Sequence, residues 1–117
     1  MRKVLIVDDN MVNRKLASAM LKKRGWEIEE AEDGTSALTR LEVGDIDYVL
    51  LDISMPGMTG EEVCRRIREM EATRNLHVVA YTAHAMESEK QRIMNAGFND
   101  IVIKPVSIQE LLSKFPD

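Results

Sequence analysis

The feature that most constrains the fold is a regular alternation of two hydrophobic patterns along the chain. Short apolar runs rich in β-branched residues are typical of buried strands. One further run alternates with period two, as expected at the edge of a sheet. In chain order, the five predicted strands are residues 3–8, 26–31, 47–52, 77–82 and 101–104, with 26–31 as the alternating one.

Each predicted strand is followed by a predicted helix; the fourth helix is polar, and in the others apolar residues recur three or four positions apart. Gly25, Gly44 and Gly97 lie where three of these helices are expected to end. T-x-x-E and S-x-x-E capping boxes open the third and fifth, at Thr59/Glu62 and Ser107/Glu110, and the fourth is predicted from about His84 to Asn95. The residues expected to face inward are Val12, Leu16 and Met20; Ala37, Leu38 and Leu41; Val63, Ile67 and Met70; and Ile108, Leu111, Leu112 and Phe115.

Strand and helix alternate five times, which predicts a parallel α/β sheet with helices on both faces, joined by right-handed crossovers. In open sheets of this kind, ligands bind beyond the carboxyl ends of the strands. The residues that follow each buried strand are therefore the candidates for a functional site.

Polar residues occupy four of these strand ends: Asp8 and Asp9, Asp52, Thr82 and Lys104. Three carboxylates in one crevice would repel one another, and a hard divalent cation such as Mg²⁺ would relieve that repulsion. The cation, the lysine and the threonine hydroxyl together could hold a phosphoryl group. Asp52 stands singly at its strand end and is the better candidate nucleophile. Taken alone, each acid could equally be a helix cap or a turn former.

Composition narrows the class of protein. The chain has 117 residues, 44% of them apolar, which suits one domain spanning residues 1–117 with its own core. The net charge of −4 gives no basic surface for nucleic acid, and no apolar run approaches the ~20 residues that span a bilayer. Cys64 is the single cysteine, so no disulfide framework is expected. We expect a cytoplasmic, monomeric protein without a membrane segment.

Four motifs, in this order and at these spacings, resemble the receiver domain of two-component response regulators over the entire chain. They are VDDN around Asp8 and Asp9, LLDISMPGMTG around Asp52, AYTAH around Thr82, and IKP at Lys104. The segments DDNMVNRKLA and YTAHAM are similar in particular to receivers of hybrid sensor histidine kinases. The resemblance implies a CheY-like (βα)5 sandwich of three layers, flavodoxin-like, with strand order 2-1-3-4-5.

The resemblance also implies roles for the residues at the strand ends. Asp52 would accept the phosphoryl group from a phosphohistidine of a sensor kinase or a histidine phosphotransfer protein. Asp8 and Asp9 would hold Mg²⁺, or Mn²⁺ in its place, with Asp9, Asp52 and the Ser54 backbone carbonyl as direct ligands. Thr82 and Lys104 would contact the phosphoryl oxygens. The chain would catalyse its own phosphorylation and dephosphorylation without being a conventional turnover enzyme.

Phosphorylation adds about −1.5 to −2 charge, and Thr82 would move toward it and shift the following loop. By resemblance, the fourth helix, fifth strand and fifth helix then present a surface to a downstream target. Ile101 stands where receivers usually carry a switch aromatic, so this coupling departs from the family pattern. The resemblance also implies that the positions of Ser54 and His84 tune the lifetime of the phosphoryl group, and that the bond before Pro105 is cis.

Three alternatives remain open from the sequence. A flavodoxin-like electron carrier would share the fold but needs a Ser/Thr/Gly-rich loop after the first strand. A haloacid-dehalogenase-type phosphatase needs a second acid two residues after its nucleophile, where this chain has Ser54. A receiver that no longer takes phosphate, and acts only as a docking module, is kept open by Ile101.

Overall fold

The computed structural model describes residues 2–83, 86–104 and 108–114, and these residues form five strands and five helices in strict alternation. The elements are β1 (Lys3–Val7), α1 (Met11–Lys22), β2 (Glu27–Ala31), α2 (Gly34–Leu41), β3 (Tyr48–Asp52), α3 (Gly60–Glu69), β4 (His77–Thr82), α4 (Glu87–Asn95), β5 (Asp100–Ile103) and α5 (Ile108–Ser113). None of the helices formed by the described residues combines the length and apolar character that a bilayer crossing needs.

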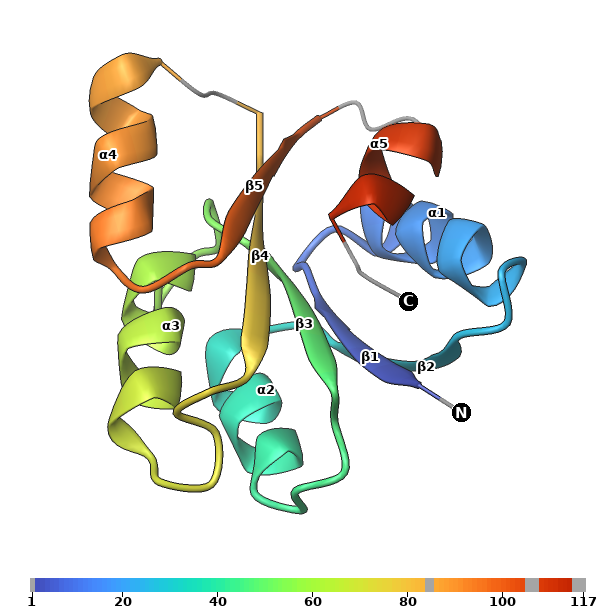
Figure 1. Ribbon diagram of the computed structural model, residues 1–117, viewed down its shortest axis with the longest axis horizontal. Coiled ribbons are helices and arrows are strands. Elements are labelled where there is room, and N and C mark those ends of the chain that lie inside the picture. Colours follow the sequence, from blue (N-terminus) through green and yellow to red (C-terminus); the bar gives the residue numbers. More distant parts are fainter. Residues whose placement is uncertain (1, 84–85, 105–107, 115–117) are drawn as a thin grey trace.

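The strands form one parallel sheet in the order β2-β1-β3-β4-β5, as the resemblance implied. The alternating segment is confirmed as the edge strand β2. Figure 1 shows α1 and α5 on one face of the sheet and α2, α3 and α4 on the other, so the three-layer architecture is confirmed.

Two hydrophobic cores fill the space between the layers, because successive side chains of a strand point to opposite faces. In β1, Val4 and Ile6 belong to the core under α1 and α5, whereas Leu5 and Val7 belong to the core under α2, α3 and α4. All four side chains are fully buried. Burial of a side chain of this size contributes roughly 1.5–3 kcal/mol, so the sheet is anchored from both sides.

The buried face of α1 differs from the predicted one. Val12 and Leu16 were expected to face inward but are 72% and 48% exposed, whereas Ala17 and Leu21 are fully buried. Met20 is half-buried and packs against the core. The prediction followed the largest apolar side chains, but close approach of a helix to a sheet favours small residues such as alanine at the contact.

The other predicted helices are located close to their expected places. Ala37, Leu41, Val63 and Ile67 are buried as predicted, and so is Leu111 of α5. The fourth helix starts later than expected, at Glu87, and Met86 precedes it without a side-chain cap. Met70 is a half-buried cap residue rather than part of α3. The expectations for Ser107 and Phe115, and for the side chains of Ile108 and Leu112, lie outside the described residues.

Candidate functional site

Three carboxylates meet at the carboxyl end of the sheet. Asp8 and Asp9 follow β1, and Asp52 ends β3; the two strands are adjacent and parallel, with Val7 opposite Leu51. One carboxylate oxygen from each acid lies within 4.8 Å of the others. Asp8 and Asp52 are buried, at 0% and 2% exposure, whereas Asp9 is exposed. The acids that the sequence predicted to converge are therefore together in one place.

Lys104 reaches the same cluster from the end of β5. Its Nζ lies 3.5 Å from Asp8 Oδ2 and 3.4 Å from Asp52 Oδ1. The ammonium also lies over the ring of Tyr81, 4.6 Å from its centroid, an arrangement that favours a cation. The backbone N–H of Lys104 donates to the Thr82 carbonyl at 2.8 Å, so these two residues are held side by side.

Thr82 and Ser54 complete the set of predicted residues. Thr82 is the last residue of β4 and is buried. The Ser54 backbone N–H donates to Asp52 Oδ1 at 3.0 Å and closes a tight turn directly after the strand. This bond and the Lys104 ammonium engage the same oxygen of Asp52, which fixes the orientation of the carboxylate.

Asp8, the buried acid next to Asp52, carries the main electrostatic cost of the cluster. Burial raises the pKa of Asp8, and the negative charge of Asp52 raises it further. The hydrogen bond from the Asn10 N–H, at 2.9 Å, and the charge of Lys104 lower it but do not compensate. Burial also raises the pKa of Tyr81, and the charges of Asp8 and Asp52 add to that rise. The cluster is thus short of positive charge.

A divalent cation fits this donor set. The three carboxylates supply hard oxygen ligands close enough to share one ion, and the single lysine leaves an excess of negative charge. Mg²⁺ takes oxygen ligands and often uses only one or two carboxylates from the protein. An exposed Asp9 beside a buried Asp8 leaves the solvent side of the cluster accessible to an ion and its waters.

Two further residues shape the site and were not predicted from the sequence. A β-carbon at Gly60, the first residue of α3, would overlap the backbone carbonyl oxygen of Asp52, so only glycine lets the helix start this close to β3. The signal was available, because glycine is a poor helix former yet directly follows the cap Thr59. Tyr81 gave no sequence signal, since it reads as an ordinary strand residue.

Of the residues predicted to take part in the switch, the structure describes only some. Ile101 is half-buried and packs against the core under α2, α3 and α4. His84 and Pro105, with the predicted cis bond, lie outside the described residues.

Comparison with known proteins places this geometry in a family. Residues 4–115 match the family model described as response regulator receiver domain. The sensor protein GacS of Pseudomonas syringae pv. syringae is 40% identical over 112 residues, which are 93% of this chain and 12% of that protein. The sensor histidine kinase RcsC of Salmonella typhi is 40% identical over 108 residues, 92% of this chain and 11% of that protein. This chain therefore spans only a small part of the length of these relatives.

Solved structures agree with these sequence matches. The chemotaxis protein CheY4 of Vibrio cholerae superposes with a TM-score of 0.92 at 31% identity, covering 97% of this chain and 94% of that chain. The receiver domain of sensor histidine kinase PA1611 from Pseudomonas aeruginosa PAO1, solved with a magnesium ion in its active site cleft, gives a TM-score of 0.89 at 32% identity, covering 96% and 92%.

Proposed function

Because this chain belongs to the response regulator receiver domain family, we propose that Asp52 accepts a phosphoryl group from a phosphohistidine in a Mg²⁺-dependent reaction. Membership of the family makes the chain a phosphoryl-transfer switch of two-component phosphorelays. The observation that carries the assignment is that Asp52, at the end of β3, lies both in the acid cluster and 3.4 Å from the Lys104 ammonium.

The transfer step follows from the placement of these groups. A carboxylate oxygen of Asp52 attacks phosphorus, the new O–P bond forms as the N–P bond of the phosphohistidine breaks, and the imidazole leaves with the electron pair. Lys104 offsets the charge of the transferred oxygens, and the Thr82 hydroxyl donates to one of them. Asp52 is then released from its ion pair with Lys104, which turns to the phosphoryl group.

The metal site is assigned to the acids of the cluster. Asp9, Asp52 and the Ser54 backbone carbonyl would be the direct ligands, with Asp8 holding the ion from the buried side. Mg²⁺, or Mn²⁺ in its place, would supply positive charge to the transferred phosphoryl oxygens. The magnesium ion in the receiver of PA1611, which is 32% identical to this chain, supports the assignment.

Phosphorylation of Asp52 would change the conformation of the elements that follow β4. The phosphoryl group draws Thr82 toward it and shifts the segment that leads into α4, so that the surface of α4, β5 and α5 changes for a downstream target. Ile101 has no ring to follow Thr82 inward, so a shift of Thr82 would pass to β5 through the backbone, by the β4–β5 pairing and by the hydrogen bond from the Lys104 N–H to the Thr82 carbonyl. The protein acts as a phosphoacceptor and not as a turnover enzyme, in the cytoplasm and as a monomer.

The decisive experiment is phosphorylation by acetyl phosphate followed by intact mass measurement. We expect one added phosphoryl group in the wild type with Mg²⁺, none after chelation with EDTA, and at least a tenfold loss in Asp52→Asn. Asp47→Asn, which changes an acid at the opposite end of the sheet, is the matched control and should be labelled like the wild type. Undiminished labelling of Asp52→Asn would place the acceptor elsewhere, and an unlabelled wild type would favour the docking module.

A further inference from the structure

Arg14, on the first turns of α1, connects the acid-bearing loop to the edge strand. Its Nη1 donates to the backbone carbonyl of Asp8 at 2.8 Å, and its Nε donates to Glu30 Oε1 in β2 at 2.8 Å. The side chain is only 13% exposed. Lys15, the next residue, binds the other oxygen of Glu30 at 2.9 Å but is 62% exposed.

The carbonyl that Arg14 holds belongs to the peptide group that joins Asp8 to Asp9. The peptide is planar, so fixing its oxygen fixes the direction in which the chain leaves toward Asp9. The other polar groups of Asp8 are already engaged, because its N–H donates to the Ala31 carbonyl at 3.2 Å and its Oδ1 accepts from Asn10. Arg14 therefore supplies the contact that sets the orientation of this peptide.

A guanidinium suits this task better than an ammonium would. Its nitrogens lie in one rigid plane, so the bond to Glu30 orients the group that donates to the Asp8 carbonyl. Burial raises the pKa of Glu30, but the hydrogen bonds from Lys15 and Arg14 outweigh this and leave the pKa below its usual value. Glu30 is thus a charged anchor that keeps Arg14 in place.

We propose that Arg14 is a positioning residue of the metal site: by holding the Asp8 carbonyl against β2, it aligns Asp9 with Asp52 and so sets the affinity for the divalent cation. This inference rests on the metal site of the proposed function. Removing a residue that orients a metal ligand typically lowers the metal affinity 10–100-fold.

The sign of the effect separates positioning from charge. Arg14 is a cation near a cation site, and removing a like charge should strengthen Mg²⁺ binding if only the electrostatic field matters. Loss of positioning should weaken binding instead. The two explanations therefore predict opposite changes in the dissociation constant for the same substitution.

The test is calorimetric titration of the unphosphorylated protein with MgCl₂. Arg14→Met keeps the apolar part of the side chain and is expected to raise the Kd for Mg²⁺ about tenfold. Arg14→Lys restores the charge without the planar fork and should also bind more weakly than the wild type. Lys15→Met is the matched control, because it removes a charge from the same Glu30 carboxylate without touching Asp8, and its Kd should stay within about twofold of the wild type. Asp9→Ala, which lacks a proposed metal ligand, is the reference for the heat measured when the metal site is lost.

A second measurement excludes general damage to the fold. In the metal-free protein, the backbone amide NMR signals of Asp9 and Asn10 should shift in Arg14→Met and stay in place in Lys15→Met. A folded Arg14→Met protein with the wild-type Kd, or a tighter one, would overturn the inference. A wild type that gives no Mg²⁺ binding would instead refute the metal site of the proposed function.

Discussion

At the residue scale, Asp8 shows how the site trades stability for a binding function. Its carboxylate is fully buried, and the charge of Asp52 adds to the effect of burial in raising the pKa of Asp8. A group whose pKa is raised on folding stabilises the fold at low pH, and that contribution is lost as the pH rises through the folded-state pKa. Without a cation, the ionised Asp8 therefore lowers the free energy of unfolding at neutral pH.

We expect Asp8→Asn to raise the Tm of the metal-free protein at about pH 7, since it removes the charge but keeps an oxygen for the Asn10 N–H. A gain of ~1 kcal/mol would correspond to about 4 °C in a domain of this size. The difference should shrink as the pH is lowered through the raised pKa of Asp8, because protonation removes the buried charge of the wild type. Thermal unfolding in EDTA, followed by circular dichroism, measures the difference in Tm and its dependence on pH.

Saturating Mg²⁺ should reverse the order of the two proteins. A ligand that binds only the folded state stabilises it in proportion to RT ln(1 + [L]/Kd), and the wild type has the charge that the variant lacks. A metal-free wild type that is as stable as Asp8→Asn at neutral pH would contradict this account of the cluster.

At the element scale, α1 presents an apolar surface next to the acids. Met11, Val12 and Leu16 are exposed, and Met11 lies two residues after Asp9. A phosphohistidine must come within bonding distance of Asp52, so the protein that carries it has to cover the surface around the site. We expect the exposed apolar residues of α1 to contact that phosphodonor, because large exposed side chains that cluster are typical of interaction sites.

The chain offers a matched pair of substitutions for this prediction. Val12 is 72% exposed on α1, and Val43 is 69% exposed after α2, at the opposite end of the sheet. The phosphodonor in this test is a phosphorylated histidine phosphotransfer domain that labels the wild type. Val12→Glu should lower the rate of transfer from it about tenfold, equivalent to ~1.4 kcal/mol. Val43→Glu should transfer like the wild type. Acetyl phosphate should label all three proteins equally, and equal transfer to both variants would exclude α1 as the contact.

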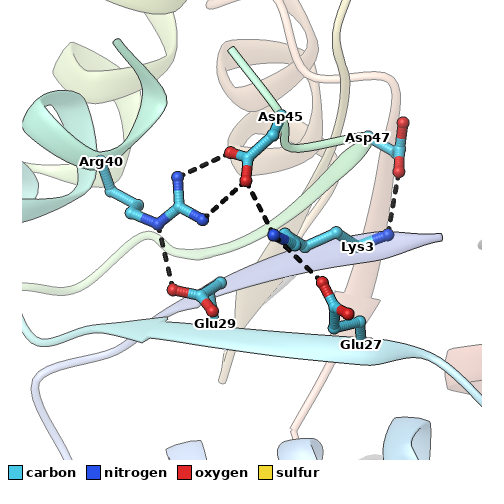
Figure 2. Close-up of polar contacts among 6 residues, drawn as sticks. All are labelled: Lys3, Glu27, Glu29, Arg40, Asp45 and Asp47. Atoms are coloured by element: carbon cyan, nitrogen blue, oxygen red, sulfur yellow. Dashed lines mark hydrogen bonds and ion pairs between the residues drawn. The ribbon is translucent and has the colours of Figure 1, made fainter. Parts of the chain in front are cut away.

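At the scale of the whole molecule, the two ends of the sheet have different tasks. The carboxyl ends of the strands hold the acid cluster, whereas charged side chains at the amino ends form a network that Figure 2 shows. In it, Asp45 accepts from Arg40 at 2.7 and 3.1 Å and from the Lys3 ammonium at 2.7 Å. Arg40 and Lys3 also pair with Glu29 and Glu27 of β2. The network joins α2, β1 and β2 and has no part in the site.

We expect Arg40→Met to lower the Tm by a few degrees and to leave the Kd for Mg²⁺ unchanged. Hydrogen bonds from Arg40, and secondarily from Lys3, hold the pKa of Asp45 well below its usual range. A depressed pKa gives stability above the unfolded-state pKa that is lost as the pH falls, so the effect of the substitution should fade in acid. It should also shrink at 1 M salt, where the Debye length is about 3 Å.

Arg66→Met is the control for this measurement. Arg66 pairs with Glu62 at 3.5 Å on the exposed surface of α3, and exposed ion pairs of this kind contribute little to stability. Equal losses of stability in the two variants would mean that the network at the amino ends is no stronger than an ordinary surface ion pair.

How much of this molecule could be predicted differs from one element to the next. The strands were predictable because β-branched runs such as that of β4 report burial on both faces through their own composition. The buried face of α1 was not, because Ala17 contributes little to a hydrophobic pattern although it makes the contact with the sheet. Arg14 likewise resembles any surface arginine until its two acceptors, on β2 and after β1, are brought beside it.

The sequence by itself determined the alternation of strand and helix, and with it a parallel sheet whose carboxyl ends carry Asp8, Asp9, Asp52, Thr82 and Lys104. These features are local, since they depend on side-chain periodicity and on which residue follows each strand. Only the tertiary structure decided which acids are buried, which oxygens Lys104 reaches, and that Gly60 lies against the Asp52 backbone. Those contacts join residues far apart in the chain. They depend on how the helices pack against the sheet, and a local sequence pattern does not specify that packing.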